Sequence, residues 1–163
     1  MFQINDVVVY GYSEVCLVKD IKTPEFIKTG EEYYFLQPLT HKASTLYVKT
    51  ANNQKAMRVI MSKDKAEEIM NDIQELPALY NENDKLREKE YLSIITACDC
   101  VGWFQALKGL SQEKKRRNDA GLKLNMVDEK NYKRVETCIA SEFSMIFNIS
   151  TEEVRENLKL AGL

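Results

Sequence analysis

The sequence predicts an α+β fold, in which a small, strongly bent β-sheet or barrel precedes a compact bundle of about five helices. Up to residue 60, short β-branched and aromatic runs alternate with turn residues, as in strands. From Ser62 onward, apolar residues recur at the three- and four-residue intervals of amphipathic helices. The change occurs within RVIMSKDKAEEIMNDIQE, residues 58–75, which we interpret as the junction between two modules, residues 1–60 and 61–163.

Four or five short strands are expected in the first module, at residues 7–10, 15–21, 33–36, 45–49 and 57–60. Pro24 and Gly30 mark a loop before the third strand, and ANNQK, residues 51–55, is a turn before the last. So small a sheet leaves edge strands, which can pair with a strand of another protein. The alternative is a solvated edge protected by Lys42 and Lys49.

Five helices are expected in the second module, at about residues 62–75, 83–96, 101–120 and 125–147, and from 150 onward. Each begins after a residue whose side chain can cap a helix N-terminus: Ser62, Asn81 or Asn83, Asp99, Asn125 and Ser150. The apolar positions expected to pack are, in helix order, Ala66, Ile69, Met70 and Ile73; Leu86, Leu92 and Ile95; Trp103, Phe104, Leu107 and Leu110; Val135, Ile139, Phe143 and Ile146; and Val154, Leu158 and Leu160.

Composition favours a folded protein that is not a general polyanion binder. The chain has 163 residues, of which 44% are hydrophobic. Its net charge is −2, so binding to a polyanion such as DNA would have to rest on a local group of basic residues. The N-terminus lacks the pattern of a signal peptide, and no run approaches 18 apolar residues, so we expect a cytoplasmic protein with no membrane span. The four cysteines are then expected to be reduced thiols.

Catalytic motifs are missing from the sequence. The single histidine, His41, lies in a polar turn without a neighbouring nucleophile, which predicts a surface histidine. The Cys98-Asp99-Cys100 segment could form a zinc site only if Cys16 and Cys138 came close to it, so buried thiols are the favoured interpretation. We therefore expect neither an enzyme nor a cofactor, and keep a cysteine-based metal or redox protein as a minor alternative.

A local concentration of positive charge is the main functional signal. Residues 108–134 contain nine basic and four acidic residues, a net charge of +5 in a chain whose total is −2. The segments KKRR and KNYKR would approach each other if two helices meet near Gly121, forming a corner that contacts phosphates. A solvated helix face with pairs such as Glu129 and Lys133 explains the charges equally well.

Three segments of the sequence, FQINDVVVY, EEYYFLQPL and TLYVKTANNQKAMRVIMSKDKAEEIM, resemble the CarD/CdnL family of bacterial transcription regulators. That family has a hydrophobic-x-x-G-D-x-V-V-Y signature at its start and an R-x-hydrophobic-hydrophobic-S segment between its halves. The resemblance extends over essentially the full length, because the basic helix pair and the short capped helix of the second half also correspond in order.

The resemblance implies a Tudor-like first module that binds the RNA polymerase β subunit by pairing strands, and a helical second module that contacts promoter DNA and stabilises the open complex. The polymerase-binding residues would be those of the fourth strand: Thr45, Leu46, Tyr47, Val48 and Lys49. The DNA-binding residues would be basic ones of the second module: Arg87, Lys114, Lys115, Arg116, Arg117, Lys130, Lys133 and Arg134. A monomer is expected, and unpaired sheet edges leave a strand-swapped dimer as the alternative.

Three departures from the family pattern stand out. Asn5 replaces the signature glycine, and residues 11–14 (GYSE) replace the usual turn. Asp84 stands where many members carry a tryptophan that wedges into the minor groove. Trp103, the only tryptophan, is expected in the core and therefore cannot serve as the wedge. We expect weaker DNA binding than in typical family members, or different target promoters. The alternative function is a protein-interaction adaptor that docks on RNA polymerase or another partner without appreciable DNA binding.

Overall fold

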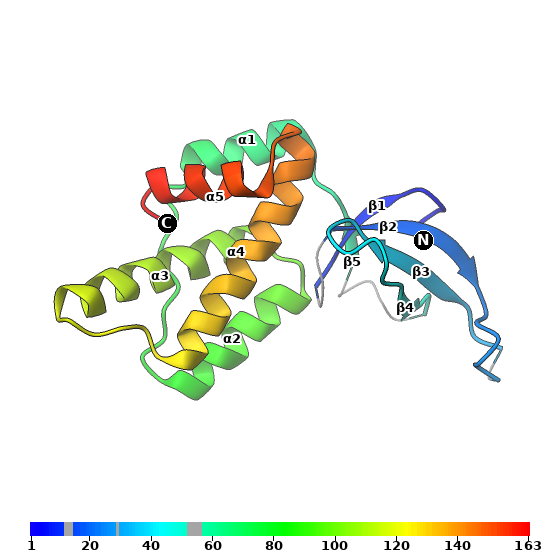
Figure 1. The fold of residues 1–163 in the computed structure, drawn as a ribbon, viewed down its shortest axis with the longest axis horizontal. Coiled ribbons are helices and arrows are strands. Elements are labelled where there is room, and N and C mark those ends of the chain that lie inside the picture. Colours follow the sequence, from blue (N-terminus) through cyan, green and yellow to red (C-terminus); the bar gives the residue numbers. More distant parts are fainter. Residues whose placement is uncertain (12–14, 29, 52–56) are drawn as a thin grey trace. The chain divides into compact units, whose positions relative to one another are not determined.

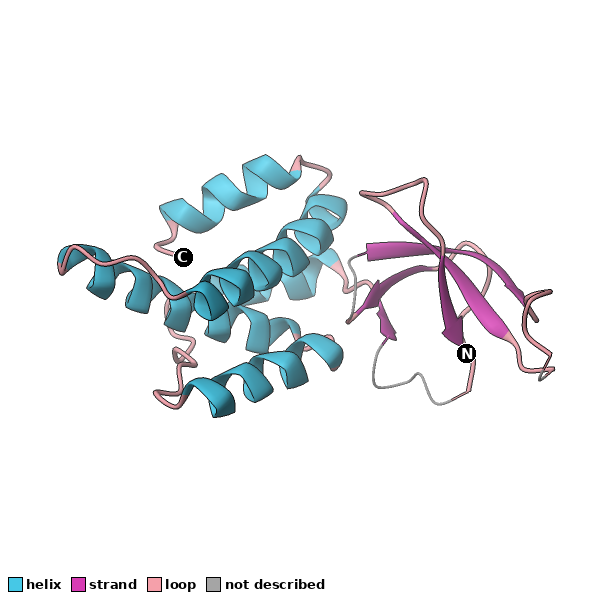
Figure 2. Cartoon of the chain, turned by 60° about the horizontal axis from the view of Figure 1, so that its bottom comes forward, coloured by secondary structure: helices cyan, strands magenta, loops and turns pink. Residues whose placement is uncertain are grey.

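The computed structural model describes residues 1–11, 15–28, 30–51 and 57–163. In these ranges the chain is α+β, as predicted: a five-stranded antiparallel sheet precedes five helices (Figures 1 and 2). The described residues divide into two compact units, Met1–Ile60 with Thr96–Cys98 and Met61–Ile95 with Asp99–Leu163, called here the sheet unit and the helical unit.

The sheet unit is an open antiparallel sheet. Its strands are β1 (Val7–Tyr10), β2 (Val15–Lys22), β3 (Tyr33–Pro38), β4 (Leu46–Lys49) and β5 (Met57–Val59), in the spatial order β4-β3-β2-β1-β5. The β2–β3 register shifts between Val18 and Asp20, an irregularity that bends and twists a sheet. One face is closed by a core of Val8, Cys16, Val18, Tyr34, Leu36, Val48 and Met57. Among the described residues, β4 and β5 therefore form the two edges.

Asn5, which stands where the CarD/CdnL signature that the sequence resembles has a glycine, has a left-handed backbone conformation with φ 75°. Glycine adopts this conformation readily, and asparagine is among the few other residues that tolerate it. The turn places the segment before β1 against β2: the Asn5 amide donates to the Val18 carbonyl at 2.8 Å, and the Val18 amide donates to the Asp6 carbonyl at 2.9 Å. Asparagine at this position is therefore compatible with the left-handed turn.

The helical unit contains α1 (Lys63–Asp72), α2 (Asp84–Thr96), α3 (Cys100–Asp119), α4 (Met126–Phe147) and α5 (Thr151–Leu160). The predicted caps are confirmed: Ser62, Asn83, Asp99, Asn125 and Ser150 each accept a hydrogen bond from a backbone amide of the first turn. Gly121 has φ 74°, and its amide donates to the Asn118 carbonyl, which ends α3 as expected.

Helix α4 is the central element of the helical unit, because α1, α3 and α5 all pack on it (Figure 1). Phe104 of α3 meets Phe143 of α4 edge-on, with ring centroids 5.3 Å apart. Trp103 is fully buried and its indole N–H donates to the Ile94 carbonyl, which confirms its predicted place in the core. All four cysteines are buried, also as predicted.

Two predictions about packing are wrong. The buried face of α2 was expected to be Leu86, Leu92 and Ile95, but Leu86 and Leu92 are exposed, and the buried residues are Arg87, Tyr91 and Ile95. An arginine occupies the core because an acid of α4 neutralises it, as described below. Leu160 was expected to pack back on the bundle but is 87% exposed. Residues 12–14, and residues 52–55 of the predicted turn, lie outside the described ranges.

Replacing Gly109 with alanine should destabilise the helical unit by about 1–3 kcal/mol, the usual range for overpacking a core. A Cβ built at Gly109 would lie 2.3 Å from the backbone carbonyl oxygen of Leu79, which already accepts a hydrogen bond from the Tyr91 hydroxyl. In an open helix position the same change is stabilising by roughly 0.5–1 kcal/mol, so the sign of the effect is the test. Urea unfolding of both proteins measures it, and a stabilised variant contradicts the contact.

Candidate nucleic-acid interface

A buried ion pair fixes the beginning of α4. Arg87 of α2 donates to both carboxylate oxygens of Asp128, each at 2.9 Å, and both side chains are almost fully buried. The Asp128 carboxylate also accepts from the Tyr80 hydroxyl at 3.1 Å and from the Asn125 side-chain amide at 3.0 Å. Because this acid lies in the first turn of α4, the cluster sets the position of that end of the helix, where several lysines lie.

The Arg87 guanidinium has further partners. It donates to Asp84, whose side chain is 74% exposed, and it stacks 4.4 Å from the centroid of the Tyr80 ring. Burial acts to lower the pKa of Arg87, but the hydrogen bonds that the guanidinium donates to the Asp128 and Asp84 carboxylates hold that pKa above the ordinary arginine value. Arg87 is therefore fully charged and fully used inside the unit. This arrangement removes it from the predicted DNA contacts and makes it a structural residue.

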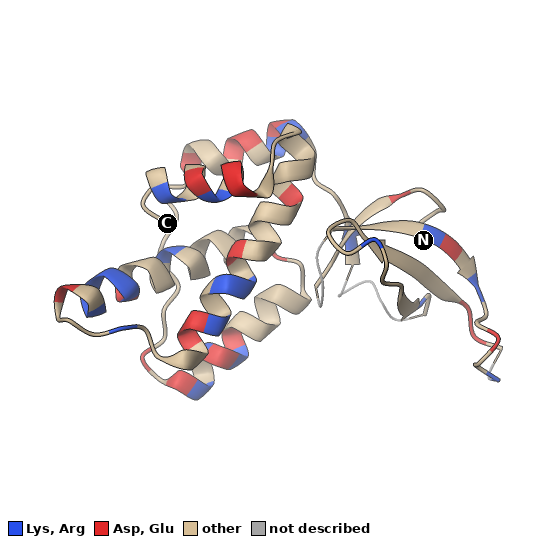
Figure 3. Cartoon of the chain, in the orientation of Figure 1, with Lys and Arg blue, Asp and Glu red and all other residues tan. Residues whose placement is uncertain are grey.

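The second half of α3 and the start of α4 enclose a groove of about 600 Å³, here called the basic groove. Its lining residues are Lys114, Asn118, Lys123, Leu124, Met126, Glu129, Lys130 and Lys133. Four lysines against one glutamate give the lining a net charge of +3. Figure 3 shows blue segments in the second half of α3 and near the start of α4. Of the two predicted basic segments, KKRR contributes Lys114 to this groove, and KNYKR contributes Lys130 and Lys133.

The four groove lysines differ in the contacts that their ammonium groups make. Lys114 lies 4.4 Å from the centroid of the Tyr132 ring, a cation–π arrangement. The Lys133 ammonium is 3.6 Å from Glu129, but its side chain is 72% exposed, and such a surface pair contributes only about 0–1 kcal/mol. Lys123 and Lys130 are exposed, and within the described part of the chain neither makes an ion pair. These lysines can therefore turn toward an anionic ligand at little cost.

The remaining predicted DNA contacts have different surroundings. Arg116 and Arg117 both donate to the buried carboxylate of Glu113, and the Arg116 hydrogen bonds lower the pKa of that carboxyl. Arg117 also donates to the Lys123 carbonyl at 2.9 Å, which ties the loop after α3 to its helix. Lys115 is exposed and Arg134 half-buried, and neither lines the groove.

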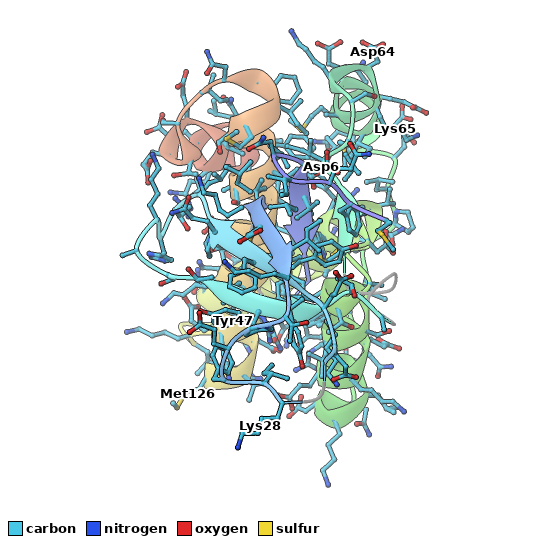
Figure 4. All side chains as sticks on the ribbon, turned by 90° about the vertical axis from the view of Figure 1, so that its right-hand side faces the viewer. Asp6, Lys28, Tyr47, Asp64, Lys65 and Met126 are labelled. Atoms are coloured by element: carbon cyan, nitrogen blue, oxygen red, sulfur yellow. The ribbon has the colours of Figure 1, made fainter. Side chains whose placement is uncertain are left out.

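Two features of this site were not predicted. Lys123 was included in the predicted net charge of residues 108–134 but not among the predicted DNA contacts. It nevertheless lines the groove together with the predicted residues Lys114 and Lys130. Met126, labelled in Figure 4, is 89% exposed and places an apolar side chain at the groove. The sequence signal for an exposed Met126 was its position directly after the cap residue Asn125, at the start of the helix. Lys108, in turn, donates to the carbonyls of Gln74 and Leu76, so its charge is used within the unit.

The predicted docking strand β4 is an edge strand that pairs with β3. Tyr47 lies opposite Phe35, and the Thr50 amide donates to the Glu32 carbonyl. In an antiparallel ladder this alternation directs the backbone groups of Leu46 and Val48 toward β3 and those of Tyr47 away from it. Thr45 lies just before the strand, and Lys49 at its end pairs with Glu31 at 2.7 Å.

An aromatic cluster lies beside this edge. Tyr47 is 44% exposed and meets Phe35 and the exposed Phe26 edge-on, with centroids 4.9 and 5.2 Å away (Figure 4 labels Tyr47). Lys22 lies 5.0 Å from the centroid of the Phe35 ring. Exposed aromatic rings beside a strand edge are the type of surface enriched at the centre of protein–protein interfaces.

Within the described ranges, no group of three or more His, Cys, Asp and Glu side chains is arranged to hold a metal ion. His41 is exposed in a turn, as predicted. No helix in these ranges combines the length and apolar content needed to cross a bilayer.

The Tyr80 hydroxyl gives the buried cluster a pH dependence. Burial, followed by the neighbouring Asp128 charge, raises the pKa of Tyr80 to about 12, above the value of about 10 expected in the unfolded chain. A raised folded pKa means that the contribution is complete below pH 10 and is lost as the pH rises towards 12. Unfolding free energies between pH 9 and 12 should therefore fall less for Tyr80→Phe than for the parent chain. Parallel profiles would contradict this.

Comparison with protein-family models and with curated proteins finds no match to the chain.

Proposed function

We propose that the chain is a non-enzymatic transcription regulator that binds the RNA polymerase β subunit through β4 and contacts promoter DNA through the basic groove, altering open-complex stability. The observation that carries the proposal is the concentration of four lysines around one groove in a chain of net negative charge. The identity of the two partners rests on the resemblance to the CarD/CdnL family. The left-handed Asn5 supports that resemblance, because it retains the backbone conformation that the signature glycine favours.

The expected DNA contact is with phosphates rather than with base edges. Lysine ammonium groups are compact point charges without the planar fork that reads guanine, so they position a protein on DNA with little sequence preference. Met126 adds an exposed apolar side chain of the kind that minor-groove proteins insert between base steps. In this proposal it takes over part of the wedge function that Asp84 cannot supply.

The test is the lifetime of the open complex on a promoter fragment, measured after a competitor challenge with and without the protein. The proposal expects a changed lifetime, and no change for a chain carrying Lys130→Glu and Lys133→Glu. Lys130 and Lys133 are chosen rather than Arg116 and Arg117, because the two arginines bind the buried Glu113 carboxylate and their replacement would disturb the fold. An unchanged lifetime with the parent chain, together with no binding to the polymerase β lobe, contradicts the proposal.

Replacing Tyr47 with proline should abolish polymerase binding while the sheet remains folded. Its amide points away from β3, so a proline there removes a donor that only an added strand would use, and edge strands tolerate proline at such positions. Tyr47→Ala is the matched control, since it removes the ring but keeps the amide. Pull-down on the isolated β lobe measures both. Equal losses in the two variants would mean that the ring, rather than strand pairing, carries the interaction.

The alternative is an adaptor that docks on the polymerase or another protein without appreciable DNA binding. It is favoured by the exposed Asp84 carboxylate and by the use of Arg87, Arg116 and Arg117 within the unit. In that case the open-complex lifetime would not respond to charge reversal in the groove, whereas binding to the β lobe would persist.

A further inference from the structure

We propose that the helical unit has a second binding surface, formed by α1, α4 and α5, that takes a basic amphipathic helix of a partner protein. This surface is separate in its residues from the basic groove, and the inference does not depend on DNA binding. It rests on an apolar groove between these helices and on the acidic character of the two helices that border it.

The groove has a volume of about 430 Å³. Its floor consists of buried apolar side chains and its walls of half-buried ones: Phe143, Val154 and Leu158, then Met70, Phe147 and Ile149. α1 and α5 each pack on α4, and the Gln74 side-chain amide donates to the Ala161 carbonyl at 2.9 Å, joining the ends of their segments. Residues of both helices therefore line the groove together with Phe143 and Phe147 of α4, and Figure 1 shows α1 and α5 beside the end of that helix.

The polar residues of this groove indicate a polypeptide rather than a small molecule. Glu67, Asn71 and Asn157 are all exposed and stand on α1 and α5, at the rim. Small-molecule sites place a few polar groups inside the cavity, where they fix the orientation of the ligand. An apolar floor with an exposed polar rim is instead what an amphipathic helix needs, with its apolar stripe inside and its charged positions at the edges.

The net charge of the two segments that border the groove indicates a basic partner. Residues 63–75 and 148–163 contain eight acidic and four basic residues, a net charge of −4 in a chain whose total is −2. Lys63, Lys65 and Arg155 are already paired with acids of the same segments, at Glu67, Glu68 and Glu152. Figure 3 shows the red segments along α1 and α5. Complementary charges at an interface favour the matching partner and repel others, and an anionic membrane surface is disfavoured for the same reason.

Titration of the isotope-labelled full chain with designed helical peptides, followed by nuclear magnetic resonance, tests the proposal. Four peptides of about 18 residues, or five helical turns, are used. Three share one leucine stripe and differ in a Lys-rich, Glu-rich or neutral polar face, and the fourth is the Lys-rich peptide with its stripe scrambled. The expected result is shifts in α1, α5 and the end of α4 with the Lys-rich peptide, which binds about tenfold or more tightly than the others.

Absence of shifts at about 1 mM Lys-rich peptide, a concentration that detects even millimolar affinity, overturns the proposal. So do shifts confined to other elements, or equal binding of the Glu-rich peptide. Shifts in the groove that grow with protein concentration alone would identify a second copy of this chain as the occupant, which also overturns it.

Matched variants locate the binding surface. Asn157→Trp fills the groove and should abolish binding, whereas Leu160→Trp adds the same ring to the same helix at an exposed position that does not line it. Glu67→Lys should weaken binding about tenfold, and Glu75→Lys, an equal charge change outside the lining, should have little effect. Equal effects within either pair contradict the assigned surface.

Discussion

Replacing Asp128 with asparagine should lower the free energy of unfolding of the helical unit by about 3–5 kcal/mol, the range for removing one partner of a buried ion pair. The substitution keeps the size of the side chain but leaves the Arg87 guanidinium charged and 1% exposed, with Asp84 as its remaining acid partner. Urea unfolding followed by circular dichroism measures the change. A loss below about 1 kcal/mol would mean that the pair does not hold the unit together.

Two further variants separate charge from packing. The double variant Arg87→Met, Asp128→Leu removes both charges and should be more stable than Asp128→Asn, because neither buried charge is left without its partner. Glu129→Gln breaks an exposed pair one residue along the same helix and should change stability by no more than about 0.5 kcal/mol. A double variant that is less stable than the single one would show that the hydrogen-bond network around Tyr80 and Asn125 dominates.

Reversing the charges of Lys130 and Lys133 to glutamate should weaken binding to duplex DNA by about 100-fold at low salt, roughly tenfold for each lost phosphate contact. Both side chains line the groove and are exposed, so the expected effect on folding is small. Lys63→Glu with Lys65→Glu makes the same change of net charge on α1 and serves as the control. Electrophoretic mobility or anisotropy titrations measure both, and equal losses would indicate that net charge, not the groove, determines binding.

Local features of the fold were predictable from the sequence, because capping depends on neighbouring residues. Ser62, Asn125 and the Ser150–Glu153 capping box set helix starts through contacts within three residues. The start of β4 was predicted to within one residue, because Pro38 ends β3 and a polar turn separates β3 from β4.

Long-range features were not predictable. Arg87 is buried only because Asp128, 41 residues away in the sequence, neutralises its charge. The sequence of α2 alone does not indicate that partner. The charge excess at the α3–α4 corner was visible in the sequence, but the partners of the individual charges were not. Glu113 pairs with Arg116 and Arg117, while Lys114, Lys123, Lys130 and Lys133 line the groove. For the same reason, leucines of α2 predicted to be buried are exposed, since the longer arginine and Tyr91 fill the space beneath that helix.

The salt dependence of DNA affinity tests most directly whether the groove contacts phosphates. The logarithm of the binding constant should fall linearly with the logarithm of salt concentration, with a slope of about −2.7 if about three phosphates are neutralised. The slope should become less negative by about 1 for each groove lysine that is replaced. A slope indistinguishable from zero, or one unchanged by Lys130→Glu with Lys133→Glu, would contradict the account.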